Sequence, residues 1–177
     1  MLSIGLHKEH GIYLYFNQSF GELHAGGGLM AKLSRIEQKL EQISAIATSG
    51  YYLALHLNMI GAEFTFKTYR PDWLEYYANN LNTFRDPVVV WGLTHFGAIR
   101  WSNIDIPDPF SVMEAAKPYG LNFGAVVAHG CLEDRSILSI ARHDRELTDD
   151  EIVIFSKYAD EIHRLTAAKP KLRPWSK

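Results

Sequence analysis

The amino-acid sequence predicts an α+β fold, an α/β/α sandwich in which a five-stranded antiparallel sheet carries helices on both faces. Five segments have strand character, and several others show helical periodicity or helix-start signals. The strands come in groups rather than alternating one by one with helices, which favours antiparallel pairing with helices packed on the faces. The length of 177 residues, with 47% apolar and 21% charged residues, fits a single globular domain.

The first clear element is an amphipathic helix from Leu29 to near Gly50. Before it, residues 12–16 are compatible with a short strand or with the start of a helix. After it, residues 51–59 and 63–68 are predicted to be two strands, because they are rich in aromatic and aliphatic residues or alternate with a period of two. The apolar residues of the helix recur at steps of three and four: Leu29, Leu33, Ile36, Leu40 and Ile43.

Proline and aspartate mark three helix starts in the middle of the chain. Pro71 opens a short helix that extends to about Asn79. Asp86-Pro87 combines an N-cap residue with proline at the first helical position, and Asp108-Pro109 repeats that signal for a helix extending to about Lys117.

The last third of the chain is predicted to supply three strands and a helix. The strands are residues 98–101, 121–128 and 136–142, with a polar turn at 133–135. Thr148 and Glu151 form a capping-box pattern at the start of the helix. The predicted buried stripe of that helix consists of Ile152, Phe155, Ala159 and Ile162.

Composition excludes several classes of protein. Lys and Arg total 18 against 20 Asp and Glu, a net charge of -2, so the chain has no basic surplus for nucleic acid. A single cysteine, Cys131, excludes a disulfide framework and a four-cysteine zinc site. No apolar run approaches 18 residues and no signal-peptide pattern opens the chain, so a cytoplasmic protein without a membrane span is expected.

The standard catalytic motifs are missing, so an enzyme is not expected. The sequence contains no G-x-S-x-G, P-loop or H-E-x-x-H pattern. His129 and Cys131 can share one face of a strand, but two ligands are too few for a zinc site, and neither a metal nor another cofactor is expected.

One constellation of aromatic and acidic residues has a distinctive spacing. Tyr69, Trp73 and Tyr77 follow one another at steps of four, and Asp86 and Trp101 come later. Taken singly, such aromatic residues indicate an ordinary core. Taken together, the pattern resembles the autoinducer-binding domain of LuxR-type quorum-sensing regulators, as does the segment 120–124, which ends in a glycine typical of that family.

The resemblance implies a domain over residues 29–168, preceded by an N-terminal extension (1–28) and followed by the start of a linker (169–177). It implies that an N-acyl-L-homoserine lactone binds between the sheet and a helical layer. In that family pattern, the Trp73 indole N–H donates to the lactone carbonyl and Asp86 accepts the amide N–H.

The same resemblance assigns the remaining contacts with the head group. Tyr69 would donate its hydroxyl to the acyl carbonyl, and Ser139 would bond the amide region. Tyr77 and Trp101 would wall the pocket around the lactone ring and the start of the chain. The candidates for lining the acyl tail, each of which could equally be ordinary core, are Leu55, Leu57 or Met59, with Val89, Val112 and Ala116.

The resemblance also implies a homodimer that reaches DNA through a C-terminal helix-turn-helix domain, which these residues do not include. Three alternatives remain open. The protein could lack that domain naturally and act as a ligand buffer or an inhibitory dimer partner. It could be an enzyme that acts on the same lactones, which would need a metal cluster or an activated nucleophile. It could be a small-molecule or haem sensor of similar fold, with His56 or His95 as the axial ligand.

Overall fold

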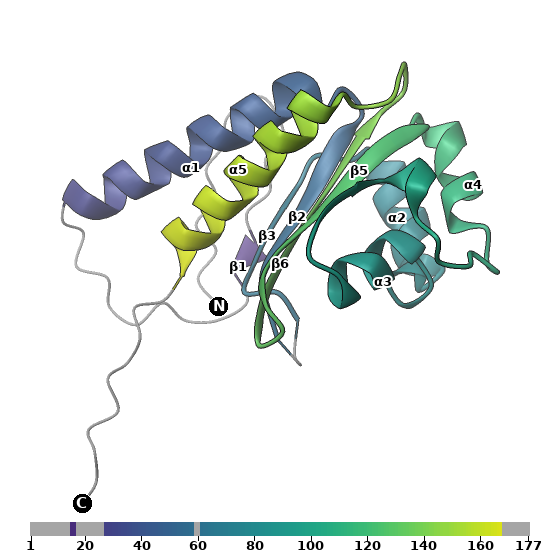
Figure 1. The fold of residues 1–177 in the computed structure, drawn as a ribbon, viewed down its shortest axis with the longest axis horizontal. Coiled ribbons are helices and arrows are strands. Elements are labelled where there is room, and N and C mark those ends of the chain that lie inside the picture. Colours follow the sequence, from purple (N-terminus) through teal and green to yellow (C-terminus); the bar gives the residue numbers. More distant parts are fainter. Residues whose placement is uncertain (1–14, 17–26, 59–60, 168–177) are drawn as a thin grey trace, which may run out of the picture.

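The computed structural model describes residues 15–16, 27–58 and 61–167. An antiparallel sheet lies between a layer of two long helices and a layer of short helices, as Figure 1 shows. The strand order is β1-β3-β2-β6-β5-β4. The predicted α+β sandwich is therefore confirmed. All five predicted strands are present, and the two-residue strand β1 (Tyr15–Phe16) adds an edge to the sheet.

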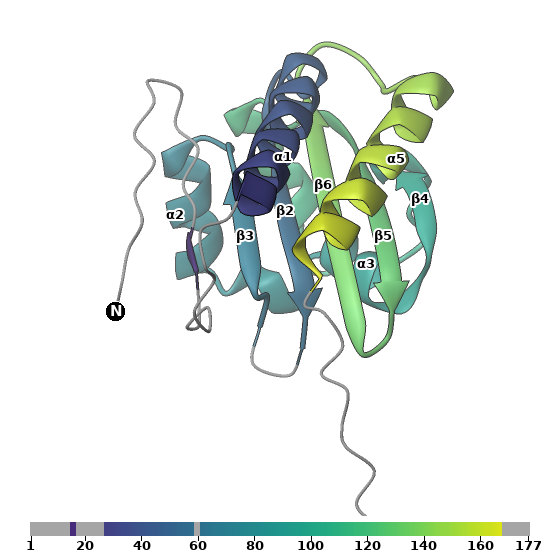
Figure 2. The ribbon, with the colours of Figure 1, turned by 90° about the vertical axis from the view of Figure 1, so that its left-hand side faces the viewer.

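The helices α1 (Gly27–Ile46) and α5 (Asp149–Thr166) lie side by side on one face of the sheet (Figure 2). The predicted capping box starts α5. The Thr148 side chain accepts the Glu151 N–H at 3.2 Å, and the Glu151 carboxylate accepts the Thr148 N–H at 2.8 Å. Each contact satisfies a backbone donor that has no partner within the helix, so the cap fixes where α5 begins.

The long strands form the centre of the sheet. β2 (Gly50–Leu57) pairs with β3 (Phe64–Lys67) on one side and with β6 (Asp134–Arg142) on the other. β6 continues into a hairpin with β5 (Phe123–Cys131), and β4 (Gly97–Arg100) closes the far edge. The predicted turn at 133–135 was wrong by position, because Asp134 already pairs with Cys131 and the turn falls on Leu132-Glu133.

The opposite face carries α2 (Pro71–Asn79), α3 (Pro87–Thr94) and α4 (Val112–Ala116). The bounds of α2 and the Asp86 cap of α3 agree with the prediction. α4 begins later than predicted, because both carboxylate oxygens of Asp108 accept N–H groups further along, from Val112 and Met113 at 2.9 Å each. Three short 3₁₀ segments complete this layer: η1 (Asn82–Phe84), η2 (Trp101–Asn103) and η3 (Lys117–Tyr119).

Two separate cores result from this arrangement, one on each face of the sheet. The first core lies under α1 and α5, and the second lies under α2, α3 and α4. The first core includes Leu40, Leu53, Leu138, Ile140, Phe155 and Ile162. The second core includes Tyr69, Trp73, Trp91, Trp101, Val112 and Ile137. None of the described helices combines the length and the apolar character needed to cross a membrane.

A bulge in β2 changes which core its side chains enter. Ala54 pairs with Ile137 and Leu57 pairs with Arg135, so β2 contains one residue more than β6 over this interval. His56 takes the left-handed conformation there, with φ of 54°. Leu53 and Leu55 both pack in the first core, and the extra residue turns Leu57 to the second core instead.

Gly124 on β5 allows the Trp101 ring to lie directly on the sheet. A Cβ atom at this position would lie 2.5 Å from the Ile140 carbonyl oxygen and from two indole carbons of Trp101. We expect Gly124→Ala to lower the free energy of unfolding by about 1–3 kcal/mol, the usual cost of overpacking a core. Urea unfolding measures this loss.

Gly92→Ala is the matched control, because the three atoms nearest to the Cβ it adds all belong to the Ile137 side chain rather than to backbone. Alanine also favours the helix by about 1 kcal/mol over glycine. A smaller loss is expected here, and a Gly124→Ala protein as stable as the wild type would contradict the close packing described.

Candidate ligand-binding site

Tyr69, Trp73 and Tyr77 of the predicted constellation meet at the second core. Tyr69 precedes α2 by two residues, while Trp73 and Tyr77 lie on it. The Trp73 side chain is buried, and its ring contacts the rings of Tyr77 and Tyr119 at centroid distances of 5.4 and 5.2 Å. The Tyr69 hydroxyl donates to Ser139 on β6, whose carbonyl oxygen is 3.0 Å away and whose Oγ is 3.2 Å away.

Asp86 lies next to these rings and is fixed from two directions. One carboxylate oxygen accepts the Val88 N–H at 2.7 Å as the N-cap of α3, and the other accepts the Tyr77 hydroxyl at 2.8 Å. Burial raises the pKa of Asp86, and these two hydrogen bonds oppose the rise. Each carboxylate oxygen has two lone pairs, so both retain the capacity to accept another donor.

Both tyrosines remain protonated donors in this environment. Burial is the main cause that raises the pKa of Tyr69 and of Tyr77, and the negative charge of Asp86 adds to it for both. The site therefore combines phenol donors with one carboxylate acceptor in a region shielded from water. That combination suits a ligand that carries both an N–H donor and carbonyl acceptors.

Trp101 contributes more than the wall predicted for it. It begins η2, and its indole Nε1 is buried without a hydrogen-bond partner among the residues that the structure describes. Buried donors are almost always paired in folded proteins, so an unpaired one marks a position where a bound molecule can accept a hydrogen bond. The sequence could not show this, because the pairing depends on contacts across the fold.

The predicted tail-lining residues divide into three groups. Val112 and Ala116 on α4 are buried in the second core. Val89 is only half-buried, because α3 turns its neighbour Val88 and Trp91 toward the sheet. Leu55 was wrong: it lies on the other face of the sheet, in the first core, and the bulge brings Leu57 to the second core instead. Met59 falls outside the described residues.

Sequence analysis missed a buried arginine, Arg135, on the face of β6 that carries Ser139. Arg135 is 2% exposed, and its Nη1 donates to the His95 carbonyl oxygen at 2.7 Å. Its guanidinium lies 3.9 Å from the centre of the Phe96 ring, while Nε and Nη2 have no partner within the described part of the chain. Strand alternation places Arg135 with Ile137 and Ser139, but the prediction began this strand one residue too late to include it.

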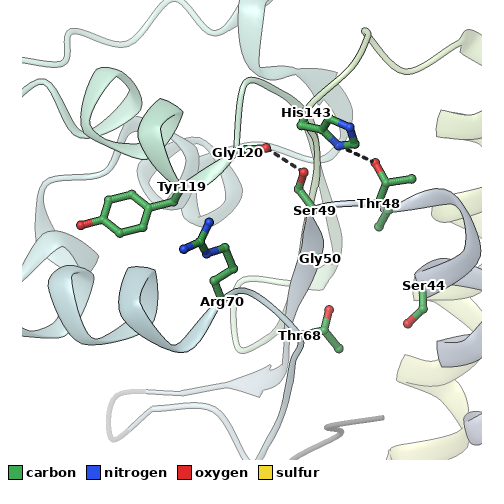
Figure 3. Close-up of a pocket in the computed structure, with 10 residues that line it drawn as sticks. Ser44, Thr48, Ser49, Gly50, Thr68, Arg70, Tyr119, Gly120 and His143 are labelled. Carbon is green, nitrogen blue, oxygen red and sulfur yellow. Dashed lines mark hydrogen bonds between the residues drawn. The ribbon is translucent and has the colours of Figure 1, made fainter.

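An open hollow of about 490 Å³ lies beside the site, where β2 begins (Figure 3). Arg70 and Tyr119 line it, together with Ser49, whose hydroxyl donates to the Gly120 carbonyl oxygen at 2.7 Å. None of the predicted ligand-binding residues lines this hollow. It touches the site through Tyr119, since that ring also contacts Trp73.

The histidines proposed as haem ligands are placed apart from this site. His56 lies on the first-core side, where both of its ring nitrogens contact polar groups, Asp134 and Thr166. His95 is exposed at the end of α3 and stacks on Trp91. These contacts of the two imidazoles involve neither Trp73 nor Asp86.

The raised pKa of Asp86 gives the protein a distinctive pH dependence. A carboxyl whose pKa is higher in the folded than in the unfolded chain contributes stability at acid pH, and this contribution is lost as the pH rises through the folded pKa. Asp86→Asn keeps an N-cap acceptor without the charge. We expect its unfolding free energy, relative to wild type, to increase from acid towards neutral pH in urea titrations.

Asp149→Asn serves as the control, because the Asp149 side chain is 90% exposed at the start of α5. Its difference from wild type should not follow the same trend. Parallel pH profiles for wild type and Asp86→Asn would contradict the burial of this charge.

Comparison with solved structures supports the fold. CepR2 of Burkholderia cenocepacia, described as an N-acylhomoserine lactone dependent LuxR family transcription factor, aligns with a TM-score of 0.54 and 14% identity over 78% of this chain and 93% of that one. Residues 1–171 of Escherichia coli SdiA align with a TM-score of 0.56 and 20% identity, over 78% of this chain and 91% of that one. SdiA in complex with octanoyl-rac-glycerol aligns with a TM-score of 0.57 and 19% identity, over 78% of this chain and 65% of that one.

Comparison with curated proteins gave no match. The family model described as "Autoinducer binding domain" matches residues 40–166, which include the aromatic and acidic constellation and both strands of the central hairpin. The chain therefore belongs to the autoinducer-binding domains of LuxR-type quorum-sensing regulators.

Proposed function

We propose that this domain binds an N-acyl-L-homoserine lactone between the sheet and the layer of α2, α3 and α4. The observation that carries the proposal is the convergence of Trp73, Asp86 and Tyr69 at the buried second core, where Tyr77 and Ser139 hold the last two in place. An indole, a carboxylate and a phenol meet there with complementary hydrogen-bonding capacities.

The polar head of such a lactone matches this group of side chains. Its one amide N–H would be accepted by Asp86, which the Val88 N–H and the Tyr77 hydroxyl already orient. Its carbonyl oxygens would accept from Trp73 and from Tyr69, whose hydroxyl would turn from Ser139 toward the ligand. The unpaired Nε1 of Trp101 is a further donor within the same layer.

The acyl tail would extend over the apolar part of the second core. Val112 and Ala116 on α4 and Leu57 at the end of β2 belong to or pack against that core. Each methylene buried there adds about 0.8 kcal/mol of affinity. A ligand that binds only the folded domain stabilises it by about 2.7 kcal/mol at a hundredfold excess over Kd.

The domain acts, on this proposal, as a cytoplasmic sensor whose ligand favours a homodimer. Binding of DNA would belong to a C-terminal domain outside these residues, and a chain without one would act as a ligand buffer or an inhibitory partner. The buried stripe of α5 is not available for dimerisation, since Phe155, Ala159 and Ile162 pack in the first core. A dimer contact of α5 would have to use its other side, where Val153 is half exposed.

The head-group contacts predict the behaviour of two variants. Asp86→Asn and Trp73→Phe should each weaken lactone binding, because one hydrogen-bond partner of the ligand is lost. A hydrogen bond to a charged group is worth about 1.5–3 kcal/mol, so Asp86→Asn should raise Kd about 10- to 100-fold. Trp73→Phe should raise Kd less, because the bond it removes is neutral. Calorimetric titration with octanoyl-homoserine lactone measures both.

Asp105→Asn is the control, because Asp105 is exposed and the change in charge is the same. A parallel titration with octanoyl-rac-glycerol tests which polar head group the site recognises, since this ester has the same acyl length as the lactone but no amide N–H. Binding of the glycerol ester alone would reject the lactone as ligand, and unchanged lactone affinity in both variants would reject the proposed contacts.

A further inference from the structure

Three polar residues from distant parts of the sequence meet on the first-core side of the sheet. His56 lies in the bulge of β2, Asp134 begins β6, and His163 lies in the last turn of α5. These elements come together at the end of the sheet where the β5–β6 hairpin turns (Figure 2). His56 and His163 are 6% and 9% exposed, whereas the Asp134 side chain is 45% exposed.

The ligand atoms of these three residues lie close enough together to surround one small cation. His56 Nδ1 lies 2.6 Å from Asp134 Oδ1, and His163 Nε2 lies 3.7 Å from Asp134 Oδ2. One ligand atom from each residue lies within 4.8 Å of those of the other two. A tetrahedral zinc ion with bonds of about 2.1 Å separates its ligands by about 3.4 Å, a value between the two carboxylate distances.

The second nitrogen of each ring is held by a hydroxyl group. His56 Nε2 lies 2.8 Å from Thr166 Oγ1, and His163 Nδ1 lies 2.8 Å from Ser136 Oγ. Histidines that bind metals usually have such a partner on the nitrogen that faces away from the ion, because it fixes the orientation of the ring.

The Thr166 hydroxyl also indicates which nitrogen of His56 carries the proton. Its Oγ lies 2.8 Å from the Ile162 carbonyl oxygen, so its one hydrogen is donated there and it accepts the Nε2–H of His56. A neutral His56 then turns the Nδ1 lone pair toward the Asp134 carboxylate. Two acceptors 2.6 Å apart repel each other, and a cation bound by both would relieve that repulsion.

The His163 ring lies beside two other imidazoles. Its centre is 4.6 Å from that of the His56 ring, and the two ring planes are inclined by 31°. His129, which is paired with Asp160 at 2.7 Å, packs its ring edge-on against His163 from the outer side.

We propose that His56, Asp134 and His163 form a binding site for a divalent transition-metal ion of the zinc class, with water as the fourth ligand. Two imidazoles and a carboxylate match the preference of Zn²⁺ for nitrogen and oxygen ligands. The half-exposed Asp134 leaves a path for entry and an open position. The ion would connect β2, β6 and α5 on the face opposite the proposed lactone site.

Calorimetry tests this proposal with the 177-residue chain, free of any histidine tag and stripped of metal with a chelator. Titration with ZnCl₂ near neutral pH should show one equivalent bound and a rise in Tm, and Co²⁺ should give the visible absorption of a tetrahedral complex. Asp134→Asn should weaken Zn²⁺ binding at least about tenfold, because it removes the anionic ligand. Its exposure makes this variant compatible with folding, which circular dichroism verifies.

Three controls separate this site from other histidines and carboxylates. His143→Ala removes an exposed imidazole outside the cluster, and Asp149→Asn removes an exposed carboxylate on α5. Replacing His7, His10 and His24 together removes the histidines near the N-terminus. All three proteins should retain Zn²⁺ binding. Absence of binding in wild type, equal affinity in Asp134→Asn, or loss of binding in a control would overturn the proposal.

Discussion

The pairing of β2 with β6 is the constraint on which the rest of the structure depends. The two strands are central in the sheet, and each contributes side chains to both cores, so the helices on either face are positioned against the same ladder. Leu53 and Leu138, paired across the ladder, face α1 and α5, while Ser139 on the opposite face accepts the Tyr69 hydroxyl. The register of this one pair of strands therefore determines which side chains of the sheet face the candidate site.

Burying polar groups in the second core costs desolvation free energy, and the local hydrogen bonds offset only part of it. The Asp86 carboxylate is buried, and its two hydrogen bonds reduce a desolvation penalty without removing it. The unpaired indole nitrogen of Trp101 carries a similar penalty. On the proposed function, these groups would weaken the domain alone and would gain partners when the ligand binds.

Local signals predicted most of this fold, and contacts between distant segments account for the failures. The bounds of α2 and the caps Asp86 and Thr148 followed from short-range hydrogen bonding that the sequence displays directly. Leu55 was misplaced because the sequence does not show which face of a largely apolar strand is turned to the site, and Leu57 reaches the second core only through a bulge that depends on how β6 pairs. The cluster of His56 with Asp134 and His163 lies beyond any spacing rule, since its members are separated by 78 and 29 residues in sequence.

The extra residue in β2 has a consequence for how this strand tolerates change. Ahead of the bulge, odd-numbered positions such as Leu53 and Leu55 face the long helices, and beyond it Leu57 faces the short ones. A single-residue deletion ahead of the bulge would shift the alternation there by one position and turn side chains from one face of the sheet to the other. The number of residues in this part of β2 is therefore constrained more strictly than their identity, so a substitution would be tolerated at positions where a deletion would not.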